Sequence, residues 1–275
     1  MTILAHRSSG TGSPVVLLHG NPTSSRLWRN VVPHLPGRRL APDLIGMGDS
    51  PRPDIAYTFD EHARYLDEWF DTLGLDDVVL IGHDWGGALA ADWASRHPSR
   101  VRGLAFTEAV LKPMTWEEFP PAGAAVFRAI KAAGELPAEF LSGLPPEYAT
   151  TFDRPLLQWA RSLPLDGEPP EIVARIEAFG RWLASSPEVP KLLVTFEPGR
   201  DTMLTPSMID WCVAEFAALE VVRRPERAGH HTPEEQPAAL AETLASWLTT
   251  VTGRPDGGIP PIGVAGPAAG TTWTA

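Results

Sequence analysis

The sequence contains very little cysteine and no long hydrophobic run, and each shortage excludes a class of protein. Cys212 is the only cysteine among 275 residues, so an intramolecular disulfide is impossible and a reducing, cytoplasmic location is expected. We expect this cysteine to be buried in a helix. No apolar stretch approaches the roughly 20 residues of a membrane span, and residues 1–6 lack the charged start of a signal peptide. A membrane partner is therefore not expected.

Positively charged residues are fewer than negatively charged ones, with 23 Lys and Arg against 34 Asp and Glu. The formal net charge is −11 at neutral pH, and no run of Lys or Arg forms a basic stripe. Nucleic acid is therefore excluded as a partner. Apolar residues make up 43% of the chain, which is enough for the core of one α/β domain with an insertion.

Short β-rich segments alternate with helical patterns along most of the chain. We expect strands at residues 14–18, 39–44, 77–81, 102–106, 191–196 and 220–224, and helices at 59–73 and 88–97. This alternation predicts an α/β fold, with a mostly parallel central sheet flanked by helices. Only residues 3–8 are available for a strand before this core.

Strand signals stop between residues 113 and 188, where Pro, Ala and aromatic residues are frequent and residues 172–183 have helical spacing. We interpret this segment as a helical cap inserted into a main domain of residues 1–112 and 189–252. Residues 253–275 contain Gly, Pro and Thr without period and are predicted to be a disordered tail.

Residues 82–87, GHDWGG, follow an apolar strand and precede an alanine-rich helix. This is the context of a nucleophile elbow, with Asp84 at the apex where the α/β-hydrolase signature usually has serine. The small residues around it permit a sharp strand-to-helix turn. A carboxylate is already anionic at neutral pH, so Asp84 can displace a leaving group from an sp3 carbon and form an alkyl ester. Water must then cleave that ester.

The loop after the first strong strand, HGNP at residues 19–22, lies where this fold supplies one oxyanion-hole amide. The backbone N–H groups of Asn21 and Trp85 are the predicted oxyanion donors. Their side chains, a carboxamide and an indole, are neutral donors that could converge on a departing anion. A halide needs such donors and no general acid, because it is not protonated at neutral pH. The alternative is that Trp85 only packs and Asn21 only shapes a turn.

Hydrolysis of the ester needs a base late in the chain, where Gly229 is followed by His230 and His231. Neutral imidazole is the common side chain that accepts a proton near pH 7. His230 is favoured because it directly follows Gly229 and precedes a helix with an acidic start, and His231 remains an alternative.

The acid that orients this histidine has two main contenders. Glu108 ends the strand-like segment at residues 103–107, and Asp201 follows the next strand. Glu197 is a weaker third candidate. The residues by themselves leave this choice open.

Four motifs together carry a family resemblance. They are HGNPTSS at residues 19–25, APDLIGMG at 41–48, GHDWG at 82–86 and PKLL at 190–193. With these motifs, the chain from about residue 14 to residue 248 resembles the haloalkane dehalogenases of the α/β-hydrolase superfamily. Residues 106–108, followed by 113–116, are similar to the subgroup whose triad acid follows the sixth strand.

The resemblance implies a role for each candidate residue: Asp84 as nucleophile, His230 as base, Glu108 in preference to Asp201 as orienting acid, and Asn21 with Trp85 as halide-binding pair. Trp116, Phe127 and Trp159 of the cap are candidates for lining the substrate pocket. The implied reaction converts a haloalkane and water to a primary alcohol and a halide ion through an alkyl-aspartate ester, with no cofactor and no metal. Two departures from the family are a short N-terminus without the usual first edge strand and a cap shortened at residues 132–159.

Two other functions compete with this reading. An epoxide hydrolase would share Asp84 and His230 but normally needs cap tyrosines to protonate the epoxide oxygen. The chain has three tyrosines, of which only Tyr148 lies in the predicted cap. The third possibility is a non-catalytic ligand-binding homologue, although every catalytic position holds a competent residue.

Overall fold

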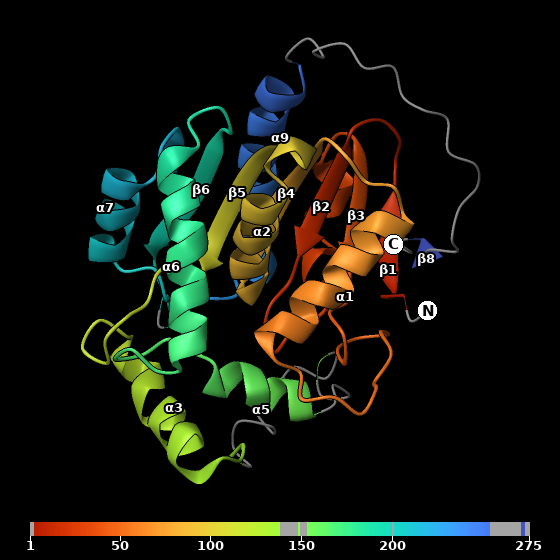
Figure 1. Cartoon of the computed structure of the whole chain (residues 1–275). Helices are drawn as coiled ribbons and strands as arrows, with labels where there is room; N and C mark the ends of the chain where they lie inside the picture. The colour runs from red at the N-terminus through yellow and green to blue at the C-terminus, as the bar shows by residue number, and fades with distance from the viewer. Residues whose placement is uncertain (1–2, 138–147, 149–152, 200, 254–270, 273–275) are drawn as a thin grey trace.

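The computed structural model describes residues 3–137, 148, 153–199, 201–253 and 271–272, and these form one central sheet with helices on both faces (Figure 1). The strands are β1 (His6–Ser9), β2 (Pro14–Leu18), β3 (Arg38–Pro42), β4 (Val78–Asp84), β5 (Val101–Ala109), β6 (Lys191–Pro198), β7 (Leu219–Ala228) and β8 (Thr271–Thr272). Their spatial order is β7-β6-β5-β4-β2-β3-β1-β8. Only the β1–β3 pair is antiparallel. The prediction of a mostly parallel sheet is confirmed.

The helices follow the predicted alternation with the strands. They are α1 (Phe59–Thr72), α2 (Trp85–Arg96), α3 (Pro121–Ala133), α5 (Asp153–Arg161), α6 (Pro170–Ser185), α7 (Pro206–Glu215), α8 (Thr232–Glu235) and α9 (Pro237–Thr252). Three short 3-10 helices are η1 (Ser25–Trp28), η2 (Val32–His34) and η3 (Pro98–Arg100). A capping box defines the start of α1, because Thr58 and Glu61 each accept from the other's backbone N–H.

The core divides into two layers because successive side chains of a strand point to opposite faces. Val16 and Leu18 of β2 pack in the layer that includes α1, α2 and α6. Val15 and Leu17 pack in the layer that includes η1, η2 and α9. Figure 1 shows the same division, with α1, α2 and α6 in front of the sheet and α9 behind it.

The inserted segment after β5 is helical where it is described. Its helices α3 and α5 lie beyond the lower end of the sheet in Figure 1, where β4 ends in Asp84. Residues 138–147 and 149–152, which make up half of the segment where the shortening is predicted, lie outside the described residues. The extent of the cap and of the main domain stays a prediction.

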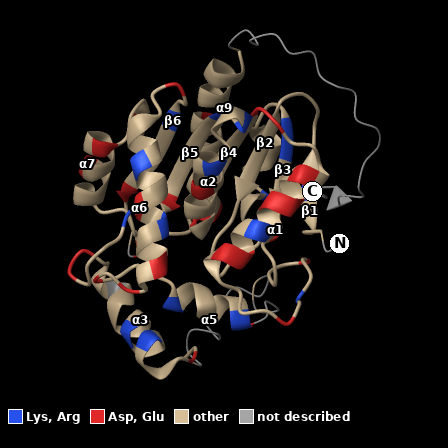
Figure 2. Cartoon of the chain, viewed as in Figure 1, with Lys and Arg blue, Asp and Glu red and all other residues tan. Residues whose placement is uncertain are grey.

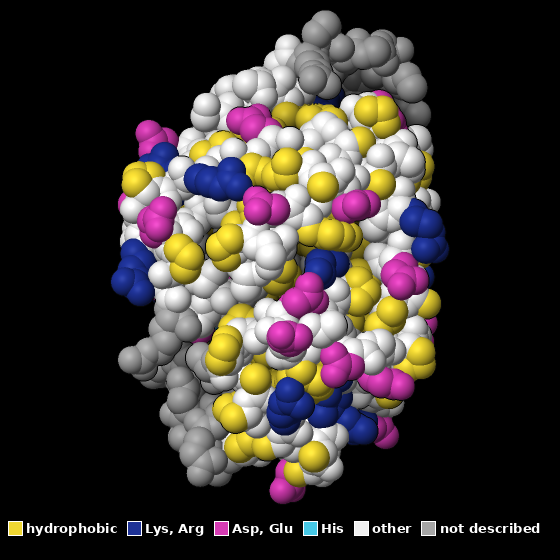
Figure 3. Space-filling model, turned by 90° about the vertical axis from the view of Figure 1, so that its left-hand side faces the viewer, with side chains coloured by type: hydrophobic (Ala, Val, Ile, Leu, Met, Phe, Trp, Pro, Cys, Tyr) yellow, Lys and Arg dark blue, Asp and Glu magenta, His cyan; other side chains and the backbone are white. Residues whose placement is uncertain are grey.

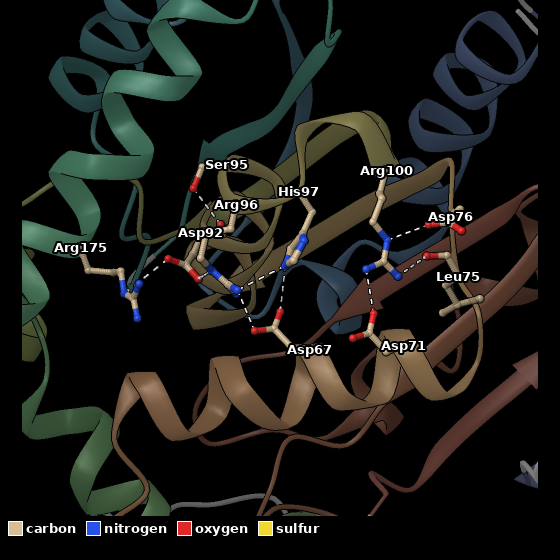
Figure 4. Close-up of polar contacts among 10 residues, drawn as sticks. All are labelled: Asp67, Asp71, Leu75, Asp76, Asp92, Ser95, Arg96, His97, Arg100 and Arg175. Carbon is tan, nitrogen blue, oxygen red and sulfur yellow. Dashed lines mark hydrogen bonds and ion pairs between the residues drawn. The ribbon is translucent and has the colours of Figure 1, made fainter.

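An ionic network joins the inserted helix α6 to the main domain (Figure 4). Asp92 of α2 is buried and has two cationic partners: Nε of Arg96 at 2.9 Å and Nε of Arg175 at 3.5 Å. Burial raises the pKa of Asp92, although both guanidinium groups oppose that rise. Arg96 also forms an ion pair with Asp67 of α1 at 2.7 Å. A continuous series of ion pairs therefore connects α1, α2 and α6.

Several predicted boundaries differ from the structure. β4 runs on to Asp84 and β5 to Ala109, and α2 already begins at Trp85, because strand and helix meet directly at the elbow. The predicted strand at residues 3–8 is β1, and no described residue before it forms a strand.

Two residues of the predicted C-terminal tail form a strand in the structure. Thr271 and Thr272 form β8 and pair in parallel with Arg7 and Ser8, where a disordered tail was expected. Without β8, β1 would be the edge strand of the sheet, and the unpaired backbone groups of an edge strand can form hydrogen bonds with another segment of chain. Residues 254–270 and 273–275 lie outside the described residues.

Figure 2 shows Lys and Arg positions spread over several helices and strands of the described chain and mixed with Asp and Glu positions. On the face turned toward the viewer in Figure 3, apolar and charged side chains are interspersed. A surface depression between α6 and α7 includes Ile176 and Trp211 but none of the predicted site residues. Within the described part of the chain, no helix is long and apolar enough to cross a membrane.

Candidate active site

Asp84 stands at the junction of β4 and α2 with a strained backbone. Its φ of 53° and ψ of −128° lie in a region that residues other than glycine rarely adopt. Glycines make the turn possible: a Cβ on Gly86 would collide with the carbonyl oxygen of Leu18, and one on Gly82 would collide with Cα of Gly87. The junction therefore has the geometry of a nucleophile elbow with a carboxylate at its apex.

The Asp84 carboxylate is buried and accepts a hydrogen bond from the backbone of the loop that follows β2. Its Oδ1 lies 2.7 Å from the backbone nitrogen of Asn21, and its Oδ2 lies 3.5 Å from Nε2 of His230. Burial by itself would raise the pKa of Asp84, but the hydrogen bond and charge of His230 outweigh it and lower the pKa. The backbone N–H of Trp85 acts in the same direction. Asp84 is therefore anionic at neutral pH.

The imidazole of His230 lies between two carboxylates. Nδ1 is 3.4 Å from Oε2 of Glu108, and the side chains of Glu108 and His230 are only 9% and 14% exposed. Burial lowers the pKa of His230, but hydrogen bonds to Asp84 and Glu108 more than reverse this and raise it above its usual value. The structure thus brings together Asp84, His230 and Glu108, which are far apart in the sequence.

Glu108 is held by local irregularity near the end of β5. The register with β4 shifts between His83 and Asp84, so that Asp84 pairs with Ala109 and Glu108 bulges out of the ladder with a φ of 47°. Its Oε2 also accepts a hydrogen bond from the backbone N–H of Met203 at 2.6 Å. This contact, which the sequence did not reveal, fixes the carboxylate beside His230.

The other acidic and histidine candidates make different contacts. Oδ1 of Asp201 accepts from the backbone N–H of His230 at 3.2 Å, and Glu197 is exposed at the end of β6. The ring of His231 lies 5.3 Å from that of His230, and burial lowers its pKa. Of the three candidates for the orienting acid, Glu108 is the one with a contact to the His230 ring among the described residues.

His83, next to Asp84 in the elbow, was missed as a positioning group. Its Nε2 donates to the carbonyl oxygen of His230 at 2.7 Å, and the two rings lie 4.7 Å apart. Burial lowers the pKa of His83 to about 3, so it is neutral at neutral pH. Its place beside the apex residue was the only sequence signal.

The two proposed halide donors both contact α5 of the inserted segment. Nδ2 of Asn21 donates to the carbonyl oxygen of Leu156 at 3.3 Å. The indole of Trp85 stacks on that of Trp159, with ring centroids 4.7 Å apart. Trp159 therefore lies against the elbow, and its role in lining the substrate pocket stays a prediction.

The other two predicted pocket residues, Trp116 and Phe127, make their ring contacts with Phe119. Both rings form edge-to-face contacts with Phe119, with ring centroids 6.1 Å apart for Trp116 and 5.4 Å apart for Phe127. The guanidinium of Arg128 lies over the Trp116 ring at 4.2 Å. All three aromatic rings pack in or against the same hydrophobic cluster as Trp85 and Trp159. The role of Trp116 and Phe127 in the pocket stays a prediction.

Tyr148, the one tyrosine of the predicted cap, is buried and donates its hydroxyl proton to Oε1 of Glu234 at 2.8 Å. Burial and the neighbouring Glu234 carboxylate raise its pKa. Arg29 forms an ion pair with the same carboxylate. In the part of the chain that is described, no three His, Cys, Asp or Glu side chains are grouped as a metal site would require.

The fold and this elbow define the chain as an α/β hydrolase, and the family model described as "alpha/beta hydrolase fold" matches residues 13–130. A haloalkane dehalogenase from Agrobacterium fabrum is 41% identical over 89% of this chain and 88% of its own length. One from Mycolicibacterium smegmatis is 42% identical over 71% and 73%. The crystal structure of haloalkane dehalogenase DatA from Agrobacterium tumefaciens C58 superposes with a TM-score of 0.82 and 35% identity, covering 91% of this chain and 96% of that one. The chain therefore belongs to the haloalkane dehalogenase family.

Proposed function

We propose that this protein hydrolyses small haloalkanes to a primary alcohol and a halide ion through an alkyl ester on Asp84. The observation that carries the proposal is the placement of His230, with Nε2 at 3.5 Å from Asp84 and Nδ1 at 3.4 Å from Glu108. This is the order of contacts that a nucleophile, a base and an orienting acid require. The family membership supports the same reaction.

In the first half of the reaction, an oxygen of Asp84 attacks the carbon that bears the halogen. The carbon–halogen bond breaks, and its electron pair leaves with the halide. The side-chain N–H groups of Asn21 and Trp85 stabilise the charge that grows on the leaving halogen. No proton is transferred in this half, so a protonated His230 does not impede it.

In the second half, His230 removes a proton from water, and the resulting hydroxide attacks the ester carbonyl. Alkylation removes the negative charge of Asp84, which is one of the two charges that raise the pKa of His230. Formation of the ester therefore lowers the pKa of His230 and favours the neutral imidazole, which is the form that can act as a base. The backbone N–H groups of Asn21 and Trp85 stabilise the oxyanion. When it collapses, the bond between the carbonyl carbon and the alkoxide oxygen breaks, and the imidazolium of His230 protonates that oxygen, so the alcohol leaves. The carboxylic acid left on Asp84 releases its proton to solvent, which restores the carboxylate.

The competing functions receive less support. An epoxide hydrolase would need a cap hydroxyl that is free to protonate the epoxide oxygen, whereas Tyr148 donates its proton to Glu234. A binding protein without activity would not need the strained carboxylate of Asp84 or its histidine partner. The cytoplasmic location is likewise a proposal, supported by the buried free thiol of Cys212.

Halide release from 1-bromobutane and 1,2-dibromoethane tests this function directly. The wild-type protein should release one halide per alcohol formed, and Asp84→Ala should release none while its circular dichroism spectrum stays unchanged. Near-parental turnover by Asp84→Ala would contradict the assignment of the nucleophile.

A further inference from the structure

His62 is a buried histidine that the proposed reaction does not use. It lies in the first turns of α1 and is 1% exposed. Both ring nitrogens are without a hydrogen-bond partner among the described residues. Burying an imidazole without such partners costs free energy, so the contacts of its ring face must explain its place in the fold.

The ring face of His62 contacts the cap side of the active site. It stacks on the indole of Trp159, with ring centroids 4.4 Å apart and planes 30° apart. Trp159 in turn stacks on Trp85 at 4.7 Å and 26°. Phe59, one turn before His62, meets both indoles edge-on. We call His62, Trp159 and Trp85 the indole stack.

The indole stack matters for halide binding because the N–H of Trp85 must point toward the halide to form a strong hydrogen bond. The strength of such a bond falls steeply as the N–H direction turns away from the acceptor, and the second torsion of a tryptophan side chain is only loosely restricted by itself. Trp159 limits that torsion in Trp85 by stacking on its ring. His62 limits Trp159 in the same way from the main domain.

We propose that His62 is a positioning residue for halide stabilisation, acting through Trp159 to hold the indole N–H of Trp85 toward the leaving halide. This inference rests on the proposed function. Burial lowers the pKa of His62 to about 3, so the ring is neutral at neutral pH and adds no charge that would compete for the halide.

Two substitutions separate the ring face from the ring nitrogens. His62→Phe keeps a flat ring for Trp159, and His62→Leu keeps apolar volume but removes the ring. Phe70→Leu is a matched control, because Phe70 is a fully buried residue of the same helix and stacks on Trp93, away from the elbow, at 4.0 Å. All three variants are compared with the wild type for thermal stability, bromide quenching of tryptophan fluorescence, and kcat/KM on 1-bromobutane and 1-chlorobutane.

His62→Leu should weaken bromide binding and widen the preference for bromobutane over chlorobutane by about tenfold, because chloride is the poorer leaving group and depends more on a well-aimed donor. His62→Phe should stay near the wild type in both, and Phe70→Leu should lower the melting temperature only. If His62→Leu does not fold, Trp159→Leu tests the same stack from the cap side.

The proposal is overturned if His62→Leu loses stability as Phe70→Leu does but keeps parental bromide binding and halide preference. It is equally overturned if His62→Phe is as impaired as His62→Leu. A wild-type protein that neither releases halide nor binds bromide would instead refute the proposed function.

Discussion

Asp201 holds the backbone of His230 rather than its ring, accepting a hydrogen bond from its backbone N–H at 3.2 Å. The ring is paired with Glu108 at 3.4 Å. The two acids that the sequence left in competition thus contact the same residue at different groups. A carboxylate that holds the loop and one that orients the imidazole should respond differently to neutral replacement.

Glu108→Gln should lower kcat by roughly 10⁴-fold, since the loss of a triad acid leaves the histidine without its orientation and tautomer. Asp201→Asn should cost far less, because the amide oxygen can still accept from the backbone N–H of His230. Steady-state kinetics on 1-bromobutane measure both. Equal or inverted losses would assign the acid to Asp201.

His230→Phe should allow alkylation of Asp84 but block hydrolysis of the ester. Attack by an ionised carboxylate needs no base, whereas activation of water does. Incubation with 1-bromobutane should therefore give a lasting mass increase equal to one butyl group, located on Asp84. His231→Phe is the matched control and should show turnover without a lasting adduct, and the reverse pattern would transfer the role of base to His231.

Trp85→Phe should raise the barrier to dehalogenation by about 3 kcal/mol, as the loss of one donor to a developing anion does in an oxyanion hole. It should also abolish saturable quenching of tryptophan fluorescence by bromide. Trp93→Phe removes another buried tryptophan of α2 and should leave both measurements near those of the wild type. Parental turnover and quenching in Trp85→Phe would place the halide elsewhere.

Stability should fall as the pH drops from about 6.5 toward 3. Burial lowers the pKa of both His62 and His83 to about 3 in the folded protein, while an unfolded histidine titrates near its ordinary value of about 6.5. Between these values the unfolded chain binds more protons, so each group costs about 1.4 kcal/mol per pH unit. Urea unfolding at several pH values measures this slope.

The same titration separates the contribution of His62 from general loss of packing. His62→Phe removes one of the two groups and should flatten the slope by about 1.4 kcal/mol per pH unit. Phe70→Leu changes no titratable group and should lose the same free energy of unfolding at every pH. A His62→Phe variant with the wild-type slope would contradict a neutral, buried His62.

Local sequence patterns were sufficient for the mostly parallel sheet, the helices α1 and α2 and the elbow. Alternating strand and helix signals predicted that the sheet is mostly parallel, and GHDWGG predicted the junction of β4 and α2 with Asp84 at its apex. These features depend on neighbours in the chain, since backbone propensity and the absence of side chains at Gly82 and Gly86 act within a few residues. A two-residue strand such as β8 has too little local pattern to be predicted.

Contacts between distant residues were decided by the tertiary structure. The pairing of His230 with Glu108 depends on the bulge in β5 and on the N–H of Met203, and the stacking of His62 on Trp159 depends on where α5 packs. The engagement of Tyr148 by Glu234 joins residues that are 86 positions apart. The sequence by itself determined which chemical groups this protein has. Only packing decided which of them meet, because hydrogen bonds and ring contacts require a distance and direction that a linear pattern does not contain.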